Sequence, residues 1–371
     1  MKLARAVLLV GLVSALSSAA SAQPAGHEIG ELRILGFTDM KLDAVDGGDI
    51  LETTSGFHMG QLILHLMRPM SERWSFFAET ATTAKSDGSF GVSFERVIAR
   101  YRYSEFFKLS MGRYHTPVNW WNESFHHGQW LQTTADRPEM TRFGGKFVPV
   151  HFVGIMEEGS ATVASLSTTW TAGIGNGRQA NIAGAGEGGD DDTHRAWLVG
   201  LDIRPDALYK LEIGGAVYQD AVPPAVQDTV TIRGGADELL VAGHLVWHGE
   251  TPEFIAEYAR IHHDAITGST DGDSEAWYAQ LGWRLAAAEE RLKPYVRYER
   301  LEIDAKDPVY GAGGSGNATR ESDRIADSRI LTAGVRIDLA TLVALKLEYQ
   351  GRKVANSDWY KTYVAQLALS F

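Results

Sequence analysis

The chain is predicted to fold as an all-β protein, a transmembrane antiparallel β-barrel of about sixteen strands. Three observations predict this fold. Apolar and polar residues alternate along most of the chain, the joins between these segments alternate in length, and the last segment, YVAQLALSF, alternates up to Phe371. Alternation with period two indicates a strand that has one apolar face. A tilted strand crosses a membrane in about 9–11 residues, which matches most of these segments.

The first 22 residues are predicted to be a secretory signal peptide rather than part of the barrel. Lys2 and Arg5 form a basic start, residues 6–16 an apolar stretch, and Ala20-Ser21-Ala22 a small-residue cleavage site. The apolar stretch is shorter than the roughly 20 residues of a membrane-spanning helix. Cleavage after Ala22 would leave residues 23–371 as an exported barrel.

Composition narrows the class of protein further. The chain has no cysteine, which excludes a disulfide scaffold and a lipid-modified cysteine anchor. Its formal charge of −12 becomes −14 when Lys2 and Arg5 are removed, and such an acidic balance argues against nucleic acid as a partner. No run of eighteen apolar residues follows the signal, so no membrane-spanning helix is expected. The expected partners are outer-membrane lipid and small solutes.

The alternating segments number about sixteen, and turn-forming residues separate them. Their expected bounds are 28–40, 56–68, 72–85, 88–103, 106–114, 149–157, 160–175, 193–204, 208–220, 237–248, 252–263, 274–286, 292–304, 327–338, 342–352 and 358–371.

The joins support the same count of strands. Short joins are expected at 69–71, 104–105, 158–159, 205–207, 249–251, 287–291 and 339–341. Most of the joins between them are longer and rich in Gly and Asp, although the join at Ser86-Asp87 is short. Short periplasmic turns and longer outer loops give this pattern in an outer-membrane barrel, with both ends of the chain on the periplasmic side.

Alternation also assigns each residue to the lipid or to the lumen. In AWLVGLDIR, Trp197, Val199 and Leu201 are expected to face lipid, and Asp202 and Arg204 the lumen, because charge at the lipid face is costly. Two segments, PYVRYERLEI and EFIAEYARIH, place a charge on the lipid face. A β-bulge would restore their phase.

The long join at residues 115–148 stands apart, because it has no clear secondary structure and contains NWWNESFHHGQW. Ordered loops of this length are usually functional. Taken with the signal, the strand count and the terminal Phe371, the architecture resembles the general porin superfamily, nearest to its phosphate-selective branch. That resemblance implies a third outer loop that folds into the pore as a constriction, and a homotrimer. The lysine-rich loop of the phosphate-selective branch is not seen in this chain.

A loop inside a wet barrel needs apolar side chains for packing and polar ones toward water. Structural packing is the favoured interpretation of this segment, and a stacking shelf for sugar rings is an alternative. The residues predicted to form the constriction loop are Trp120, Trp121, His126, His127 and Trp130.

A metal site is a further alternative, built from His115, His126, His127 and His151. Neighbouring histidines on an extended backbone point apart, and their spacing matches no ligand motif. No metal and no cofactor are therefore expected.

Charged residues predict how the lumen selects solutes. In FERVIARYRY, Arg96, Arg100 and Arg102 share one strand face, and Arg33 and Arg113 are expected nearby on neighbouring strands. Such a ladder, opposed to acids of the loop, would favour anions, whereas internal salt bridges would make it a neutral wall. The predicted pore-lining residues are Arg96, Arg100, Arg102, Arg113, Glu123, Asp136 and Glu139.

These observations predict an outer-membrane channel for passive diffusion of small hydrophilic solutes, with an anion preference. A barrel of about 16 strands leaves an aqueous channel. No Ser/His/Asp set at an interpretable spacing indicates catalysis, so an enzyme is not expected. The alternatives are an outer-membrane barrel enzyme, such as a lipid hydrolase, and a plugged barrel with a structural or binding role.

Overall fold

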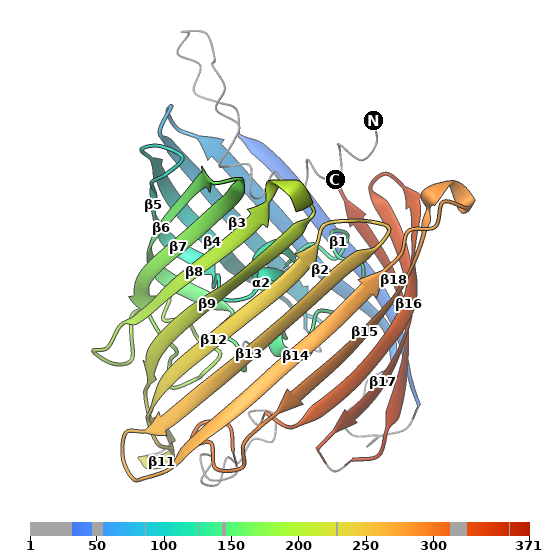
Figure 1. The fold of residues 1–371 in the computed structure, drawn as a ribbon. Helices are drawn as coiled ribbons and strands as arrows, with labels where there is room; N and C mark the ends of the chain where they lie inside the picture. Colours follow the sequence, from blue (N-terminus) through green and yellow to red (C-terminus); the bar gives the residue numbers. More distant parts are fainter. Residues whose placement is uncertain are drawn as a thin grey trace.

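The protein forms a closed barrel of sixteen antiparallel strands in the computed structural model, which confirms the predicted fold class (Figure 1). The structure describes residues 32–46, 55–85, 87–125, 127–142, 146–227, 229–311, 325–355 and 357–371. The predicted signal peptide, residues 1–22, lies outside the described residues.

Each barrel strand pairs with its neighbours in chain order, and two further strands form a separate hairpin. The barrel strands are β1 (Arg33–Asp46), β2 (Gly56–Pro69), β3 (Trp74–Ala84), β4 (Phe90–Arg102), β5 (Lys108–His115), β6 (His151–Val163), β7 (Leu166–Asn176), β8 (Ala196–Pro205), β9 (Leu211–Val222), β12 (Ala236–Trp247), β13 (Glu253–Ala265), β14 (Asp271–Gly282), β15 (Leu292–Glu302), β16 (Ser328–Ala340), β17 (Val343–Val354) and β18 (Tyr360–Ser370). The hairpin is β10 (Ala225–Gln227) and β11 (Val230–Arg233), and the helices are α2 (Trp120–Phe125), η1 (Glu139–Thr141), η2 (Asp206–Leu208) and η3 (Ala288–Glu290).

The barrel closes where β1 pairs with β18, from Phe37 opposite Ser370 to Asp46 opposite Lys361. Gly36 and Phe371 continue this ladder, with N–H···O distances of 2.8 and 2.9 Å between their backbones. The ring of Phe371 lies directly over Gly36, where a Cβ atom would come within 2.3 Å of it. Closure satisfies the backbone groups of both edge strands, as a barrel in lipid requires.

The join predicted at 158–159 was wrong, because the chain turns at Ala164-Ser165 instead. Both turn residues have left-handed backbone angles, φ 49° and 64°, which suit a two-residue hairpin. Gly159 lies inside β6, and a Cβ atom there would come within 2.2 Å of the Trp170 ring. The glycine therefore makes room for a cross-strand aromatic and does not mark a turn. β1 begins at Arg33 among the described residues, and residues 28–31 of its predicted span lie outside them.

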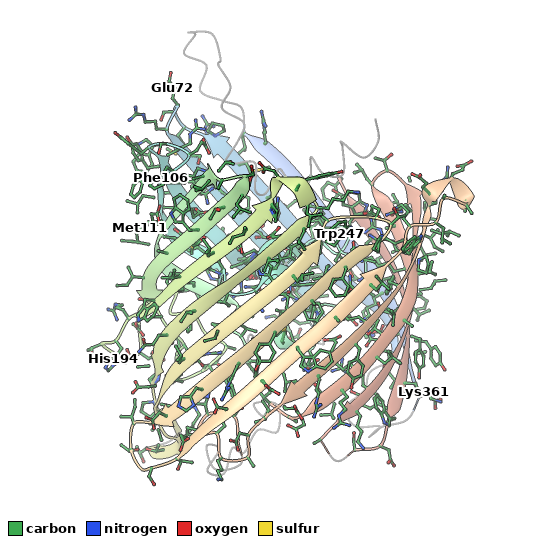
Figure 2. The ribbon with its side chains drawn as sticks, in the orientation of Figure 1. Glu72, Phe106, Met111, His194, Trp247 and Lys361 are labelled. Carbon is green, nitrogen blue, oxygen red and sulfur yellow. The ribbon has the colours of Figure 1, made fainter. Side chains whose placement is uncertain are left out.

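The outer surface of the barrel is apolar, as the alternation predicted. Trp197, Val199 and Leu201 are exposed on β8, while Leu198 between them is buried. Met111 on β5 projects away from the wall in the same manner (Figure 2). Such an outward apolar surface suits lipid contact. No helix among the described residues is long and apolar enough to cross a membrane.

The two segments that did not sort between lipid and lumen contain no bulge. The pairing of β13 with β14 and of β14 with β15 is regular throughout. Their outward charges lie near one end of the strands, where Arg260 binds Asp273 at 2.9 Å and Arg300 binds Glu302. Pairing with carboxylates at the rim therefore accounts for these charges.

A bulge occurs instead in β4, where the register with β3 shifts after Glu79. Arg96 pairs opposite Glu79 and Phe94 opposite Thr80, so Glu95 is the extra residue. A bulge lets two consecutive side chains turn to one face. Glu95 and Arg96 both reach groups of the interior, as their ion pairs show.

Candidate functional site

The segment between β5 and β6, residues 116–150, is called the inner loop. Its helix α2 lies inside the barrel wall (Figure 1). The Trp121 side chain is fully buried, with ring centroids 5.0 Å from Phe125 and 6.0 Å from Tyr278 of β14. The guanidinium of Arg297 on β15 lies 5.6 Å from the Trp121 ring centroid. The tryptophan thus fixes α2 against the inward face of neighbouring strands.

The start of α2 is held by one carboxylate of β13. Glu257 accepts hydrogen bonds from the backbone N–H of Trp121 at 3.0 Å and the side-chain amide of Asn119 at 3.2 Å. The hydroxyl of Tyr278 donates a third. The first N–H groups of a helix have no partner within it, so an acceptor from the wall satisfies one of them.

The middle of the inner loop is held through its backbone carbonyl groups. Arg336 on β16 donates to the carbonyls of Trp130 and Gln132 at 2.6 and 2.9 Å. Lys346 on β17 donates to those of Gln129 and Thr134 at 2.5 and 2.8 Å. These cations supply hydrogen bonds to backbone carbonyl groups that lie outside helices and strands.

The predicted loop acids bind basic groups of the same wall. Asp136 lies 3.0 Å from the Lys41 ammonium, and Glu139 lies 2.8 Å from the Arg352 guanidinium. Burial alone would raise the pKa of Asp136, but Lys41 and a hydrogen bond from Gln350 outweigh it and hold the pKa below its usual value. Neither acid is paired with the arginines of β4 in these contacts.

Most hydrogen bonds from the inner loop to barrel strands reach one part of the wall. These hydrogen bonds reach side chains of β1, β2, β13 and β15–β18, including Gln61, Glu253 and Gln366. This contact with the wall agrees with the packing role predicted for the aromatic residues of the inner loop. His126, one of the predicted constriction residues, lies outside the described residues.

The predicted arginine ladder does share one inward face of β4, and each member has a carboxylate partner. Arg96 lies 2.5 Å from Glu79, and Arg100 lies 2.6 Å from Glu158. Arg102, the last residue of β4, lies 3.3 Å from Glu105.

Arg113 on β5 is also paired, within reach of Glu95 at 3.5 Å and Glu187 at 2.8 Å. It donates to the carbonyl of Phe94 at 2.6 Å as well. The four predicted arginines are therefore largely neutralised by partners close to them.

Three of the four histidines considered for a metal site come together. The ring centroid of His115 lies 5.7 Å from that of His127 and 5.6 Å from that of His151. Two carboxylates face them: Glu79, 3.4 Å from His115, and Glu95, 3.4 Å from His127 and 2.9 Å from His151. The cluster ties the inner loop to strands β3–β6.

Glu123 is the one predicted loop acid without a basic partner among the described ion pairs, and it is exposed within the barrel. Enclosure by the barrel and the carboxylates of Asp202, Glu158 and Glu212 raise the pKa of Glu123 to about 8. At neutral pH the side chain is therefore mostly uncharged.

On strands that make few hydrogen bonds to the inner loop, inward charged side chains remain in contact with solvent. The Arg204 side chain on β8 is 50% exposed and that of Asp202 is 33% exposed, although both face the interior. Arg100 and Glu158 continue this open wall on β4 and β6. The inward faces of β4, β6, β8, β9 and β12 are together called the open wall.

No family model and no curated protein matches the chain, but solved structures match its fold. The anion-selective porin from Comamonas acidovorans superposes with a TM-score of 0.62 at 10% identity, covering 92% of this chain and 99% of that one. This chain has a porin-like fold. OmpT of Vibrio cholerae, in trimer form, gives 0.60 at 11%, covering 93% and 100%. The outer membrane channel DcaP of Acinetobacter baumannii gives 0.56 at 10%, covering 95% and 100%.

Sequence reasoning missed the residues that hold the inner loop, chiefly Glu257, Arg297, Arg336 and Lys346. Alternation places Arg336 and Lys346 on an inward face, which was a usable signal, whereas Glu257 and Arg297 lie in the two segments that did not sort. No pattern in the sequence pairs an inward residue with a particular part of a loop more than a hundred residues away. Those pairings depend on where the loop crosses the lumen.

Proposed function

We propose that the protein is an outer-membrane channel through which small hydrophilic solutes diffuse passively. The observation that carries the proposal is the open wall, where inward side chains such as Arg204 and Asp202 keep contact with solvent. A barrel of about 16 strands is wider than its own side chains can fill. The apolar outer surface supports location in the outer membrane.

The inner loop serves as the constriction in this proposal. Most of its hydrogen bonds reach β1, β2, β13 and β15–β18, so it narrows the lumen and leaves the solvent-exposed side chains of the open wall along the path. Its many hydrogen bonds to the wall support a fixed filter. A channel selects by the size and charge of such a narrow part.

We propose weak charge selectivity at neutral pH. The arginines of β4 that would attract anions each lie beside a carboxylate, and Arg204 lies beside Glu212 at 2.8 Å. The anion preference expected from the ladder alone stays a prediction. So does membership of the phosphate-selective branch, which the similar solved structures do not support.

The assembly proposed is a homotrimer, as the resemblance to porins implies. Chemical cross-linking of the protein in membranes should give a ladder that ends at three chains. A ladder that ends at one chain would remove the trimer from the proposal and leave the channel untouched.

Liposome swelling tests the proposed function. Vesicles that contain the folded protein should swell in small sugars, at rates that fall steeply as the sugar becomes larger. A folded barrel that gives no swelling would support a plugged binding barrel. Release of fatty acid from the vesicle lipid, without swelling, would support a barrel enzyme instead.

A further inference from the structure

Three potential metal ligands meet on the open wall, one from each of three adjacent strands. They are Asp202 of β8, Glu212 of β9 and His244 of β12, and their ligand atoms lie within 4.8 Å of one another. His244 Nε2 is 3.4 Å from Asp202 Oδ1 and 3.5 Å from Glu212 Oε1. None of the three was predicted as a site residue from the sequence.

A glycine makes this approach possible. Gly214 lies on β9 between the other two strands, and a Cβ atom there would come within 2.0 Å of Asp202 Oδ1 and 2.6 Å of His244 Nε2. The carboxylate and the imidazole thus occupy the space that a side chain would fill. Gly214 has no left-handed backbone angle, so backbone conformation does not explain it.

The Nε2 atom of His244 faces the two carboxylates of the cluster. Its side chain is only 8% exposed, and Nε2 has no hydrogen-bond partner among the described residues. Buried polar atoms nearly always have a partner, so an unsatisfied one calls for an explanation. A ligand at the centre of the three groups would supply it.

The spacing fits a tetrahedral metal ion. Bonds of about 2.0–2.1 Å to nitrogen and oxygen place tetrahedral ligand atoms about 3.3 Å apart, close to the two distances from His244 Nε2. We propose that Asp202, Glu212 and His244 bind a divalent transition metal, for which Zn²⁺ is the best match. One imidazole and two carboxylates suit Zn²⁺, whereas Mg²⁺ and Ca²⁺ prefer oxygen ligands alone.

Neighbouring groups orient one ligand toward the ion. Arg204 Nε and His248 Nε2 lie 2.8 and 2.6 Å from Glu212 Oε2, which leaves Oε1 directed to the site. Such outer contacts fix ligand geometry in metal proteins. Asp202 is partly exposed to the lumen, so ions reach the site from water and a water molecule completes the coordination.

The histidine cluster around Glu79 is a weaker candidate for metal. Glu79 Oε2 already lies 2.5 Å from the Arg96 guanidinium, and its other oxygen is 3.0 Å from His65 Nε2. A metal ion would have to displace a charge-assisted bond within a fully buried network. The site on the open wall has no such competitor for Asp202 Oδ1 or His244 Nε2.

Zn²⁺ binding to the folded, tag-free protein in detergent tests the proposal without using its channel activity. A chelator competition titration should reveal a site that His244→Gln and Asp202→Asn each weaken by about 100-fold or more. His262→Gln is the matched control, because His262 is partly exposed beside a single carboxylate, Asp273, and should change nothing. Millimolar Mg²⁺ should not compete. Equal Zn²⁺ binding by wild type and both ligand variants would overturn the proposal.

A glycine pair tests the geometry without removing a ligand. Gly214→Ala should lose the site because its methyl group takes the space of Asp202 and His244. Gly243→Ala should keep it, since the nearest atom to a Cβ there is 3.7 Å away. Folding is checked by the shift in gel mobility on heating. A folded Gly214→Ala variant with unchanged Zn²⁺ affinity would contradict the proposed site.

X-ray absorption of the Zn²⁺-loaded wild type requires no variant to fold. The proposed site predicts one imidazole among oxygen ligands. Two or more imidazoles per ion would place the metal in the histidine cluster instead and refute the assignment. Because these measurements record binding, they stand whether or not the channel conducts.

Discussion

Replacing Glu257 with alanine should release the inner loop from the wall. Glu257 is 3% exposed and accepts two bonds from the loop, from the N–H of Trp121 and the amide of Asn119. A hydrogen bond to a charged group contributes about 1.5–3 kcal/mol net, so the two together stabilise docking by about 3–6 kcal/mol. The barrel itself should remain folded, because its strands satisfy their own backbone groups.

Two assays report the release. Limited proteolysis of the folded barrel should cut the variant within residues 119–130 at least tenfold faster than the wild type. Single-channel records should show larger and noisier current steps. Glu275→Gln is the control, because Glu275 lies on neighbouring β14 and binds only the outward hydroxyl of Tyr258 in the described contacts. Unchanged proteolysis and conductance in Glu257→Ala would refute the anchoring role.

Three further predictions concern the path itself. Deleting residues 119–130 should raise single-channel conductance and leave a heat-modifiable, folded barrel; loss of assembly would instead make the segment part of the fold. Replacing Arg100 and Arg102 with serine frees Glu158 and Glu105, so the reversal potential in a salt gradient should shift toward cations; an unchanged potential would place both arginines away from the conducting path. Because the pKa of Glu123 is about 8, raising the pH from about 6 to 10 adds one negative charge and should shift selectivity toward cations. Glu123→Gln should remove most of that shift, and an equal shift in the variant would assign it to other groups.

Most of the barrel could be predicted, because the side that each strand residue faces depends on its own polarity and that of its neighbours in the sequence. Each lipid-facing residue must be apolar and each charge must find water or a partner, so alternation alone placed Trp197 outward and Asp202 inward. The positions of the joins between strands were predicted less accurately. Gly159 resembled a turn residue in the sequence, yet it makes room for Trp170 across the hairpin.

The candidate sites were harder to predict, because their members are brought together by register. Asp202, Glu212 and His244 lie on three strands, and only the pairing of β8, β9 and β12 makes them neighbours. The histidines near Glu79 show the same limit. Their separation along the chain argued against a metal site, but the inner loop returns His127 to the ends of β5 and β6.

The bulge in β4 had a faint signal in the sequence. Phe94 and Val97 both face outward although they are three residues apart, which breaks strict alternation, and Glu95 and Arg96 both turn inward. In a regular strand, one of two consecutive charged residues would have to face lipid. Such a pair can indicate a bulge beside a functional wall.

Single-channel recording of the purified, refolded protein in a planar bilayer tests whether the barrel is an open channel. An open channel with paired charges should give stable, uniform current steps and a small reversal potential in a salt gradient at neutral pH. A correctly folded barrel that inserts and passes no current would contradict the proposed function. The inner loop would then be a plug across the whole lumen, and the open wall would not be a path.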